Sequence, residues 1–523
     1  MYGYTGKILF VDLSTGQSRV ERFDETFARQ YLGGNGFAAK ILCEHLVPGI
    51  DPLSPENMLV LAVGPVTDTL IQSNCRGYIA TKSPLTGLYS DSTFGGRFAA
   101  MQKRTGFEAI VVTGKAPQPS YLLVTEEGAE IKPAGSAWGQ LTLEAIETIR
   151  SREGIKDLDV LAIGPAGEHL VRFACAVHAF QSRDAIAGRG GIGAVMGSKN
   201  LKGIAVRGNI KTEVASLAAV KTVVRENSEQ VKVGTKGLAE FGTPILVQPI
   251  NTMGLLGTRN VQQEVFAQAQ AISGERLKDL FWERDTTCFR CSIACGKDFR
   301  VDEGEFAGIR AKMPEYETLF AFGSMADVDE PAAIIKANKL CDELGLDTIS
   351  MGVTLTFVME CVEKGLLSTQ EIGRELTFGN YHAMLDLIEA TARREGFGNL
   401  LAEGSARLAD HIGKEASRFL YAVKRLELPA HSARGLKGMS IGYATATRGG
   451  SHHDTRPTLQ YDPNFDRKSI EGKPAFAIRT QNFTAVDDSL TQCRFTSERG
   501  FGGMLNEKYA QMINTVTGWN LSV

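Results

Sequence analysis

The stretch Cys288-Phe-Arg-Cys291-Ser-Ile-Ala-Cys295 gathers three cysteines on one short segment, and a fourth, Cys493, follows about two hundred residues later. A short loop can aim three thiolates at one [4Fe-4S] cluster, and the fold must then deliver the fourth. Zinc is the nearest competitor, but zinc sites usually present two close cysteine pairs or a pair followed by histidines, and no such histidines stand near Cys493. A chance cluster of buried thiols remains the other alternative. The pattern therefore favours an electron-transfer centre joined across the fold.

The composition is that of a sizeable globular protein. With 523 residues and 43% hydrophobic content, the chain can bury several cores, and its length predicts about two to four domains. Its 57 basic and 60 acidic residues give a net charge of -3, so no global field attracts nucleic acid. The remaining cysteines have no framework spacing, which favours a reducing compartment over a disulfide scaffold; they are Cys43, Cys75, Cys175, Cys341 and Cys361.

The N-terminus has no secretory signal, because Lys7 follows six uncharged residues and no long apolar region comes after it. No apolar run approaches the roughly 20 residues that a membrane span needs. We therefore expect a soluble, cytoplasmic protein whose partners include neither nucleic acid nor membrane.

The spacing of apolar residues along the chain changes near residue 208. Before it, short apolar runs closed by glycine, proline or aspartate predict strands and tight turns, including a hairpin over residues 7–21 around Gly16. After it, helical spacing predicts helices over 216–231, 331–344, 350–364, 381–395 and 399–412. A second, less distinct boundary lies near residue 420, where the chain enters another glycine-rich region. We predict an α+β protein with a β-rich domain over 1–208 and mainly helical domains over 209–420 and 421–523.

Two acidic motifs share one spacing. Asp342 and Asp347 lie near the expected C-terminal end of the 331–344 helix, which Gly345 ends. Carboxylates there face the negative end of the helix dipole, at a cost of about 0.3–1 kcal/mol. A ligand rich in N–H donors would offset this cost, and a solvated acidic turn is the alternative. Asp488 and Cys493 repeat the spacing of Asp342 and Asp347, which favours the ligand.

Two glycine-containing stretches suit an anion. Residues 75–97 combine cations, hydroxyls and flexible backbone, as a phosphate-bearing ligand requires, although an ordinary turn-rich β segment would look similar. Residues 183–193 contain a formal G-x-G-x-x-G starting at Gly188. Residues 180–187 lack a strand pattern, so the strand-turn-helix context of a dinucleotide site is missing. We interpret this stretch as an arginine-flanked loop close to an anion.

Two positions are candidates for proton transfer, Glu317 and the pair His452-His453. Histidine titrates near neutrality, and burial can raise the pKa of a glutamate towards it. Structural roles for these residues remain the alternative.

Together these motifs resemble the aldehyde:ferredoxin oxidoreductase family of tungsten enzymes, from Gly6 through Cys493. The resemblance is carried by residues 82–87, 187–191, 197–202, 288–295, 314–318, 342–347, 448–452 and 488–493. It implies a tungsten or, alternatively, molybdenum atom between two pyranopterins, a Mg²⁺ bridging their phosphates and a [4Fe-4S] cluster beside one pterin. It also implies a saddle-like base domain of two sheets, covered by two mainly helical domains.

The resemblance assigns a role to each motif by position. Asp342 and Asp347, with Leu346 between them, would bind one pterin, and Asp488 and Gln492 the other. Cys288, Cys291, Cys295 and Cys493 would hold the cluster, and Glu317 and His452 would be the catalytic residues. The phosphate and magnesium side would be lined by Arg76, Thr93, Gly95, Arg183, Ala187, Gly188, Arg189 and Gly190.

The implied activity is oxidation of an aldehyde to a carboxylate, with electrons leaving through the cluster to ferredoxin or a ferredoxin-like subunit, in a homo-oligomer or a hetero-complex. A benzoyl-CoA-reductase-type catalytic subunit that reduces an aromatic acyl-CoA is a second hypothesis. The third, from another class, is a non-catalytic [4Fe-4S] electron-relay protein.

The chain departs from the family pattern in four places. Thr93 stands where many relatives have asparagine, and Thr491-Gln492 replaces a glycine-leucine step. The Glu-x-x-His pattern of a metal between subunits is not supplied by Glu330-Pro-Ala-Ala, so we expect no metal-bridged dimer. Relatives commonly continue for several tens of residues beyond the position of Val523, so we expect C-terminal helices that shape the substrate channel to be missing.

Overall fold

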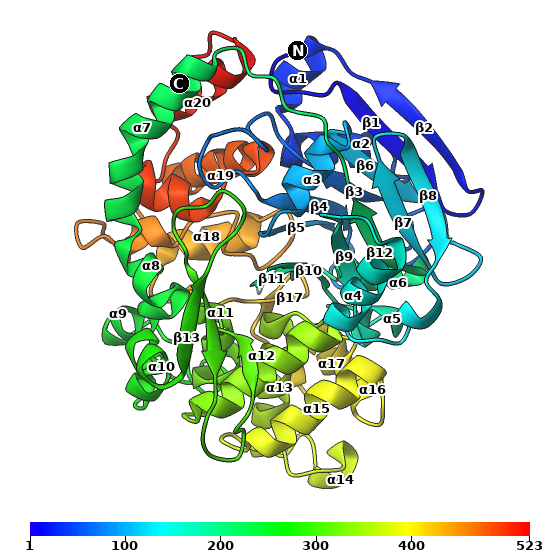
Figure 1. Ribbon diagram of the computed structural model, residues 1–523. Helices are drawn as coiled ribbons and strands as arrows, with labels where there is room; N and C mark the ends of the chain where they lie inside the picture. The colour runs from blue at the N-terminus through cyan, green and yellow to red at the C-terminus, as the bar shows by residue number, and fades with distance from the viewer. Residues whose placement is uncertain (182) are drawn as a thin grey trace.

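Two six-stranded mixed sheets form the N-terminal part of the computed structural model, which describes residues 1–181 and 183–523 (Figure 1). The strand order is β2-β1-β6-β3-β4-β5 in the first sheet and β11-β10-β9-β12-β7-β8 in the second. The strands are β1 (Lys7–Asp12), β2 (Gln17–Arg22), β3 (Leu59–Ala62), β4 (Gly77–Lys82), β5 (Tyr89–Phe94), β6 (Ala109–Thr113), β7 (Ser120–Thr125), β8 (Gly128–Pro133), β9 (Asp159–Ile163), β10 (Ala176–Phe180), β11 (Arg183–Ala187) and β12 (Leu201–Val206).

The two sheets share a core, and each is also covered on its outer face. In β1, Leu9 and Val11 join a buried cluster that also holds Leu122 and Val124 of β7, whereas neighbouring positions such as Phe10 pack against helices. Both faces of these strands are therefore buried, which explains why they read as continuous apolar runs rather than as alternating patterns.

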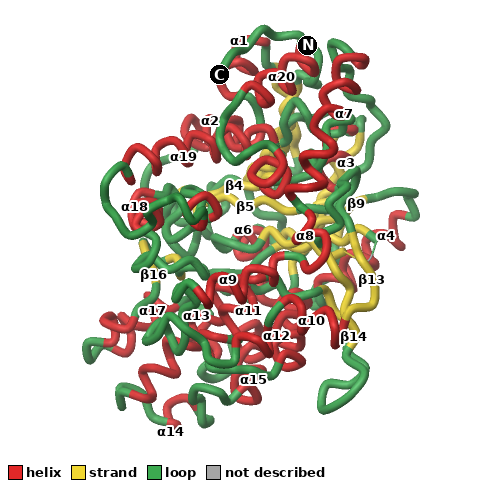
Figure 2. The backbone as a smooth tube through the Cα atoms, turned by 90° about the vertical axis from the view of Figure 1, so that its left-hand side faces the viewer, coloured by secondary structure: helices red, strands yellow, loops and turns green. Residues whose placement is uncertain are grey.

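Helices cover the sheets and fill the rest of the molecule. In Figure 2 the strands of the sheets lie in the upper part, and α11, α12, α13 and α15 gather below them. The helices are α1 (Glu25–Tyr31), α2 (Gly34–His45), α3 (Phe98–Arg104), α4 (Thr142–Glu153), α5 (Pro165–Glu168), α6 (Ile192–Ser198), α7 (Leu217–Gly234), α8 (Lys236–Phe241), α9 (Val247–Thr252), α10 (Gly274–Phe281), α11 (Tyr316–Phe322), α12 (Pro331–Leu344), α13 (Thr348–Glu363), α14 (Thr369–Ile372), α15 (Tyr381–Arg393), α16 (Gly398–Leu401), α17 (Ser405–Ile412), α18 (Lys437–Thr445), α19 (Lys473–Leu490) and α20 (Glu507–Thr517).

Two small sheets interrupt the helical part, one of three strands and one of two. Short 3₁₀ turns and one π turn, Thr496–Gly500, join the remaining elements. One of the 3₁₀ turns is η6 (Thr458–Tyr461), which precedes α19. The strands are β13 (Trp282–Thr286), β14 (Gly296–Arg300), β15 (Arg310–Lys312), β16 (Ala422–Val423) and β17 (Leu426–Glu427).

The predicted fold class is confirmed, with two sheets first and mainly helical structure after them. The hairpin of β1 and β2 is confirmed, and α12 begins and ends where the sequence predicts, with Gly345 at φ 81°. The domain boundaries at residues 208 and 420 stay predictions.

Two local predictions are wrong. The expected helix over 399–412 is split into α16 and α17, because the chain turns at Gly404 with φ 85°. Residues 183–187 form strand β11, although they lack an apolar pattern, because β11 is an edge strand that pairs antiparallel with β10. A strand therefore does precede the glycine loop, but its partner is antiparallel rather than the parallel neighbour of a dinucleotide-binding unit.

None of the helices in the described parts of the chain combines the length and apolarity needed to cross a membrane.

Candidate active site

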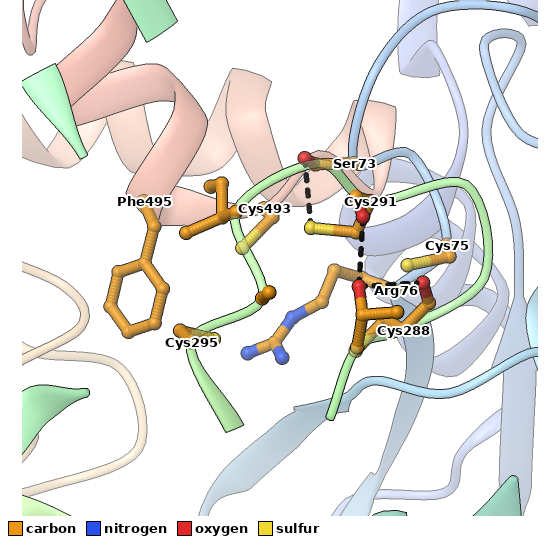
Figure 3. Close-up of a pocket in the computed structure, with 11 residues that line it drawn as sticks. Ser73, Cys75, Arg76, Cys288, Cys291, Cys295, Cys493 and Phe495 are labelled. Carbon is orange, nitrogen blue, oxygen red and sulfur yellow. Dashed lines mark hydrogen bonds between the residues drawn. The ribbon is translucent and has the colours of Figure 1, made fainter. Parts of the chain in front are cut away.

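Four cysteines from distant segments line one pocket (Figure 3). Cys288, Cys291 and Cys295 lie on the loop between β13 and β14, and Cys493 lies just beyond the end of α19. Ser73 joins the two segments, because its hydroxyl lies 3.4 Å from Cys291 Sγ and its carbonyl accepts a hydrogen bond of 3.1 Å from Cys493 N. The sequence-predicted thiols are thus brought together by the fold.

A fifth thiol, Cys75, lines the same pocket. The sequence predicted no site for this cysteine, because it has no framework spacing with the others. It precedes β4 and is 2% exposed. A hydrogen bond with Cys288, together with burial, raises its pKa well above the usual thiol range. Gly95 also borders this site: a Cβ added there would lie 2.7 Å from Cys288 Sγ. No spacing in the sequence reveals Cys75, because its segment meets residues 288–295 only in the fold.

The chemistry of this donor set fits a cationic iron cluster. Burial raises the pKa of Cys493 to about 11 and also raises that of Cys291. Such crowded thiols would be neutral on their own at pH 7, and only a bound metal makes a group of adjacent thiolates favourable. Cysteine thiolates are the usual ligands of iron–sulfur clusters.

The first acidic motif joins two helices. Asp342 lies in the last turn of α12, where its Oδ2 accepts a bond of 3.0 Å from Asn338 and lies 3.6 Å from Lys312 Nζ. Asp347 lies beyond the helix and caps α13, since its Oδ1 accepts a bond of 3.0 Å from Ile349 N. The expectation that Asp347 faces a negative helix end is therefore wrong, because it sits at the positive end of the next helix. Leu346, between them, is buried.

The second motif begins at the end of α19 and leads to Cys493. Asp488 forms an ion pair of 2.8 Å with Arg494. Gln492 donates from Nε2 to the carbonyl of Gln72 at 2.7 Å, while its Oε1 is buried. This segment packs tightly on the start of α2, because a Cβ added to Gly34 would lie 2.2 Å from Asp488 O.

The predicted phosphate side is built from β4, β5 and the glycine loop after β11. Arg76 donates from Nη2 to Thr93 Oγ1 at 3.2 Å, so the hydroxyl that replaces the expected asparagine already meets a cation. Ala187 ends β11, and Gly188, Arg189 and Gly190 follow it. Gly190 lies against β5, since an added Cβ would stand 1.9 Å from Ser90 Oγ.

Arg189 connects this loop to the first motif, because its Nε lies 3.2 Å from Asp347 Oδ2 and its Nη2 donates to Glu427 O at 2.5 Å. The backbone of Arg183 belongs to β11, but its predicted contact with phosphate involves a side chain outside the described residues.

Glu317 and His452 also come together, and a second histidine joins them. Glu317 lies in the first turn of α11. His452 Nε2 lies 3.8 Å from Glu317 Oε1, and His431 Nε2 lies 3.2 Å from the same oxygen. The other oxygen, Oε2, accepts a bond of 2.8 Å from Ala430 N. His431 was missed from the sequence because no motif links it to Glu317.

Glu317 is held in its ionised form. Burial acts to raise its pKa, but attraction to His452, the contact with His431 and the bond from Ala430 outweigh burial and bring the pKa down to about 2. The expectation that burial raises this pKa towards neutrality is therefore wrong. Burial also lowers the pKa of His452 well below its usual range. The directions of these two shifts favour a carboxylate at Glu317 and disfavour protonation of His452.

Several buried polar atoms near these motifs have no hydrogen-bond partner among the described residues. An unsatisfied buried donor or acceptor costs about 1–3 kcal/mol, so their concentration here fits a polar ligand with both donors and acceptors. They include Arg189 Nη1, Ser90 Oγ, Glu427 Oε2, His452 Nδ1, Gln492 Oε1 and Arg494 Nε.

Among solved structures, the fold is similar to the active-site complex BamBC of benzoyl coenzyme A reductase in complex with 1,5-dienoyl-CoA. The TM-score is 0.85 over 100% of this chain and 86% of that chain, at 24% sequence identity. At that identity the likeness concerns the fold alone. A protein named as the WOR-like subunit of an aliphatic sulfonate oxidoreductase from Pyrococcus furiosus is 29% identical over the whole chain and 83% of its own length.

Closer similarity is found with proteins named tungsten-containing aldehyde ferredoxin oxidoreductase. The protein from Pyrococcus horikoshii is 41% identical, and the one from Thermococcus kodakarensis 39%, each over 100% of this chain and 86% of its own length. Residues 8–208 match the N-terminal domain of aldehyde ferredoxin oxidoreductase, and residues 218–523 match its domains 2 and 3. The chain is therefore an enzyme of the aldehyde ferredoxin oxidoreductase family, whose similar members are tungsten-containing oxidoreductases.

Proposed function

We propose that the protein oxidises an aldehyde to a carboxylate at a tungsten bis-pyranopterin and passes the electrons, through a [4Fe-4S] cluster, to ferredoxin or a ferredoxin-like subunit in the cytoplasm. The observation that carries this proposal is the convergence of Cys288, Cys291 and Cys295 with Cys493, directly after the second acidic motif. A cluster held there lies next to whatever that motif binds.

The chain has side chains suited to the amine edge of a pterin and side chains suited to its phosphate. Carboxylates accept hydrogen bonds from amine and amide N–H groups, so Asp342 and Asp347 suit the amine edge of one pterin and Asp488 that of the other. Nη1 of Arg189 is buried and has no hydrogen-bond partner in the described chain, which suits a phosphate oxygen. A Mg²⁺ bridging the phosphates would lie on the same side, near Thr93 and the loop from Ala187 to Gly190.

When bound, the metal–pterin group supplies the two-electron acceptor that side chains lack. Glu317, as a carboxylate, is suited to orient the water that adds to the aldehyde carbon and, because its pKa is low, to accept a proton from it only as the new carbon–oxygen bond forms and the water becomes acidic. His452, as a neutral imidazole, is suited to donate a hydrogen bond to the oxygen on which negative charge develops. The Nδ1 of His452 has no hydrogen-bond partner among the described residues and is therefore able to do so.

Variants of Glu317 and His452 test these roles in metal-replete protein with a dye as electron acceptor. We expect Glu317→Gln and His452→Asn each to lower the rate of aldehyde oxidation by about 10²–10⁴-fold. Glu315→Gln is the matched control, because Glu315 lies two residues away and accepts a bond from Thr243. A near-wild-type rate in Glu317→Gln would refute the assignment, and reduction of an aromatic acyl-CoA without aldehyde oxidation would favour the alternative activity.

A further inference from the structure

His431 differs from His452 in the hydrogen-bond partner of its Nδ1, the ring nitrogen that does not approach Glu317. Both imidazoles approach Glu317 Oε1, but the Nδ1 of His452 has no partner among the described residues. The Nδ1 of His431 lies 2.5 Å from the hydroxyl oxygen of Tyr461. Only for His431, therefore, is a further proton-carrying group found on the side away from Glu317.

The contact continues towards the surface. His431 is 4% exposed, whereas Tyr461, at the end of η6, is partly exposed and is followed by the exposed residues Asp462, Pro463 and Asn464. The carboxylate, the imidazole and the phenol thus form a row that ends at a partly exposed residue next to an exposed segment of the chain.

The backbone around His431 is fixed on both sides. The hydroxyl of Tyr443 donates to His431 O at 2.8 Å, and that of Tyr316 donates to Ala430 O at 2.9 Å. Ala430 N in turn binds Glu317. The imidazole is therefore held against the carboxylate by contacts that take no part in proton transfer. Catalytic hydrogen bonds commonly tighten once the reactants are bound, so the 3.2 Å separation from Glu317 is suitable.

We propose that His431 and Tyr461 form the path by which protons leave Glu317, an inference that rests on the proposed function. Oxidation of RCHO with H₂O gives RCOO⁻, three protons and two electrons. The electrons pass to the bound metal–pterin and the cluster, and then to a one-electron carrier. The relay needs the His431 tautomer that carries its proton on Nδ1. A proton taken up by Glu317 then passes to His431 Nε2, the Nδ1 proton passes to the Tyr461 oxygen, and the hydroxyl proton of Tyr461 passes to water; the ring returns to the Nδ1–H tautomer before the next proton. His431 acts as a positioning and relay residue rather than at the substrate itself.

The experiment follows electrons and protons separately in a single turnover of the holoenzyme. Cluster reduction is read from visible absorbance, and proton release from a pH-indicator dye in weak buffer. In the wild type we expect the two signals to rise together. In His431→Asn, with unchanged iron and tungsten content, we expect proton release to lag at least about tenfold behind cluster reduction, because a relay group contributes on the order of 10²-fold. Tyr461→Phe is expected to show a smaller lag.

Added imidazole should restore proton release in a His431→Gly variant, which a purely structural role for the residue would not allow. His411→Asn is the matched control, since His411 is exposed at the end of α17 and should behave as wild type. Proton release in step with cluster reduction in both His431→Asn and Tyr461→Phe would overturn the relay. A wild-type enzyme that reduces no cluster with any aldehyde would instead overturn the proposed function.

Discussion

The two acidic motifs use the same construction, with one difference. Each stands at the C-terminal end of a long helix, α12 or α19, and this end abuts a glycine of the N-terminal part, Gly164 directly after β9 or Gly34 at the start of α2. A Cβ added to Gly164 would lie 2.4 Å from Leu344 O, and one added to Gly34 would lie 2.2 Å from Asp488 O. The first helix is ended by Gly345 at φ 81°, and the second by Thr491 at φ 56°.

The difference suggests separate tasks for the two motifs. After Gly345 the chain enters another helix, so the first motif is a joint between α12 and α13. After Thr491 it leads to Cys493. A β-branched residue in the left-handed region costs about 1–2 kcal/mol, and here the Thr491 hydroxyl lies 2.7 Å from that of Thr67. The second motif therefore holds a less favourable turn, and we attribute this to the need to bring Cys493 to the cysteine pocket.

The largest expected contrast concerns the cysteine beside each motif. Cys493→Ala should abolish the four-iron signal in electron paramagnetic resonance and iron analysis, because one ligand is lost. Cys341→Ala, beside the first motif on α12, should keep the iron. Cys75→Ser should keep it too, although Cys75 lines the same pocket. An intact cluster in Cys493→Ala would remove the distinction between the motifs.

A large loss of stability is expected where each helix end meets its glycine. Gly34→Ala and Gly164→Ala each place a Cβ against backbone, and we expect about 3 kcal/mol or more of destabilisation. The measurement is the melting temperature of the loaded protein, with Gly154→Ala as control. Nothing lies within 4 Å of a Cβ at Gly154, so this variant carries only the cost of an alanine at φ 61°, about 1–2 kcal/mol. If only one of the two variants loses stability, the two helix ends are not equivalent.

An intermediate effect is expected at the turn of the first motif. Gly345→Ala adds the cost of a left-handed alanine, about 1–2 kcal/mol, to a contact of 3.0 Å with Gly164 N. Gly373→Ala is a close match, because Gly373 ends α14 at φ 80° and has nothing within 4 Å of an added Cβ. The difference between their melting temperatures isolates the contact. Equal values would show that α12 does not rely on close approach to the sheet.

The smallest effect is expected at the turn of the second motif. Thr491→Gly removes strain of about 1–2 kcal/mol but also removes a buried hydrogen bond worth about 1 kcal/mol. We therefore expect a melting temperature close to that of the wild type, with the iron content unchanged. A strong loss of stability would mean that the Thr67–Thr491 contact, rather than Asp488 and Gly34, holds this segment.

The sequence predicted the parts whose patterns are local. Proline at the start and Gly345 at the end define α12, and apolar runs between turn residues define most strands. The sequence did not predict the parts whose structure depends on contacts between segments far apart in the chain. Strand β11 is polar and forms because β10 offers an edge, and Asp347 was misplaced because the start of α13 was set two residues too late. His431 and Cys75 carry no motif, so only the fold reveals that they lie beside Glu317 and Cys288.

The most direct test of the account is the metal content of anaerobically purified, untagged protein, measured together with aldehyde-dependent dye reduction. If the two motifs bind one metal–pterin group and the cysteines hold a cluster beside the second motif, as we propose, the protein should contain about four iron atoms and one tungsten or molybdenum atom per chain, and should release pterin on denaturation. Iron at that level without tungsten, molybdenum or pterin would contradict the account, because the two motifs would then serve only to hold the fold together.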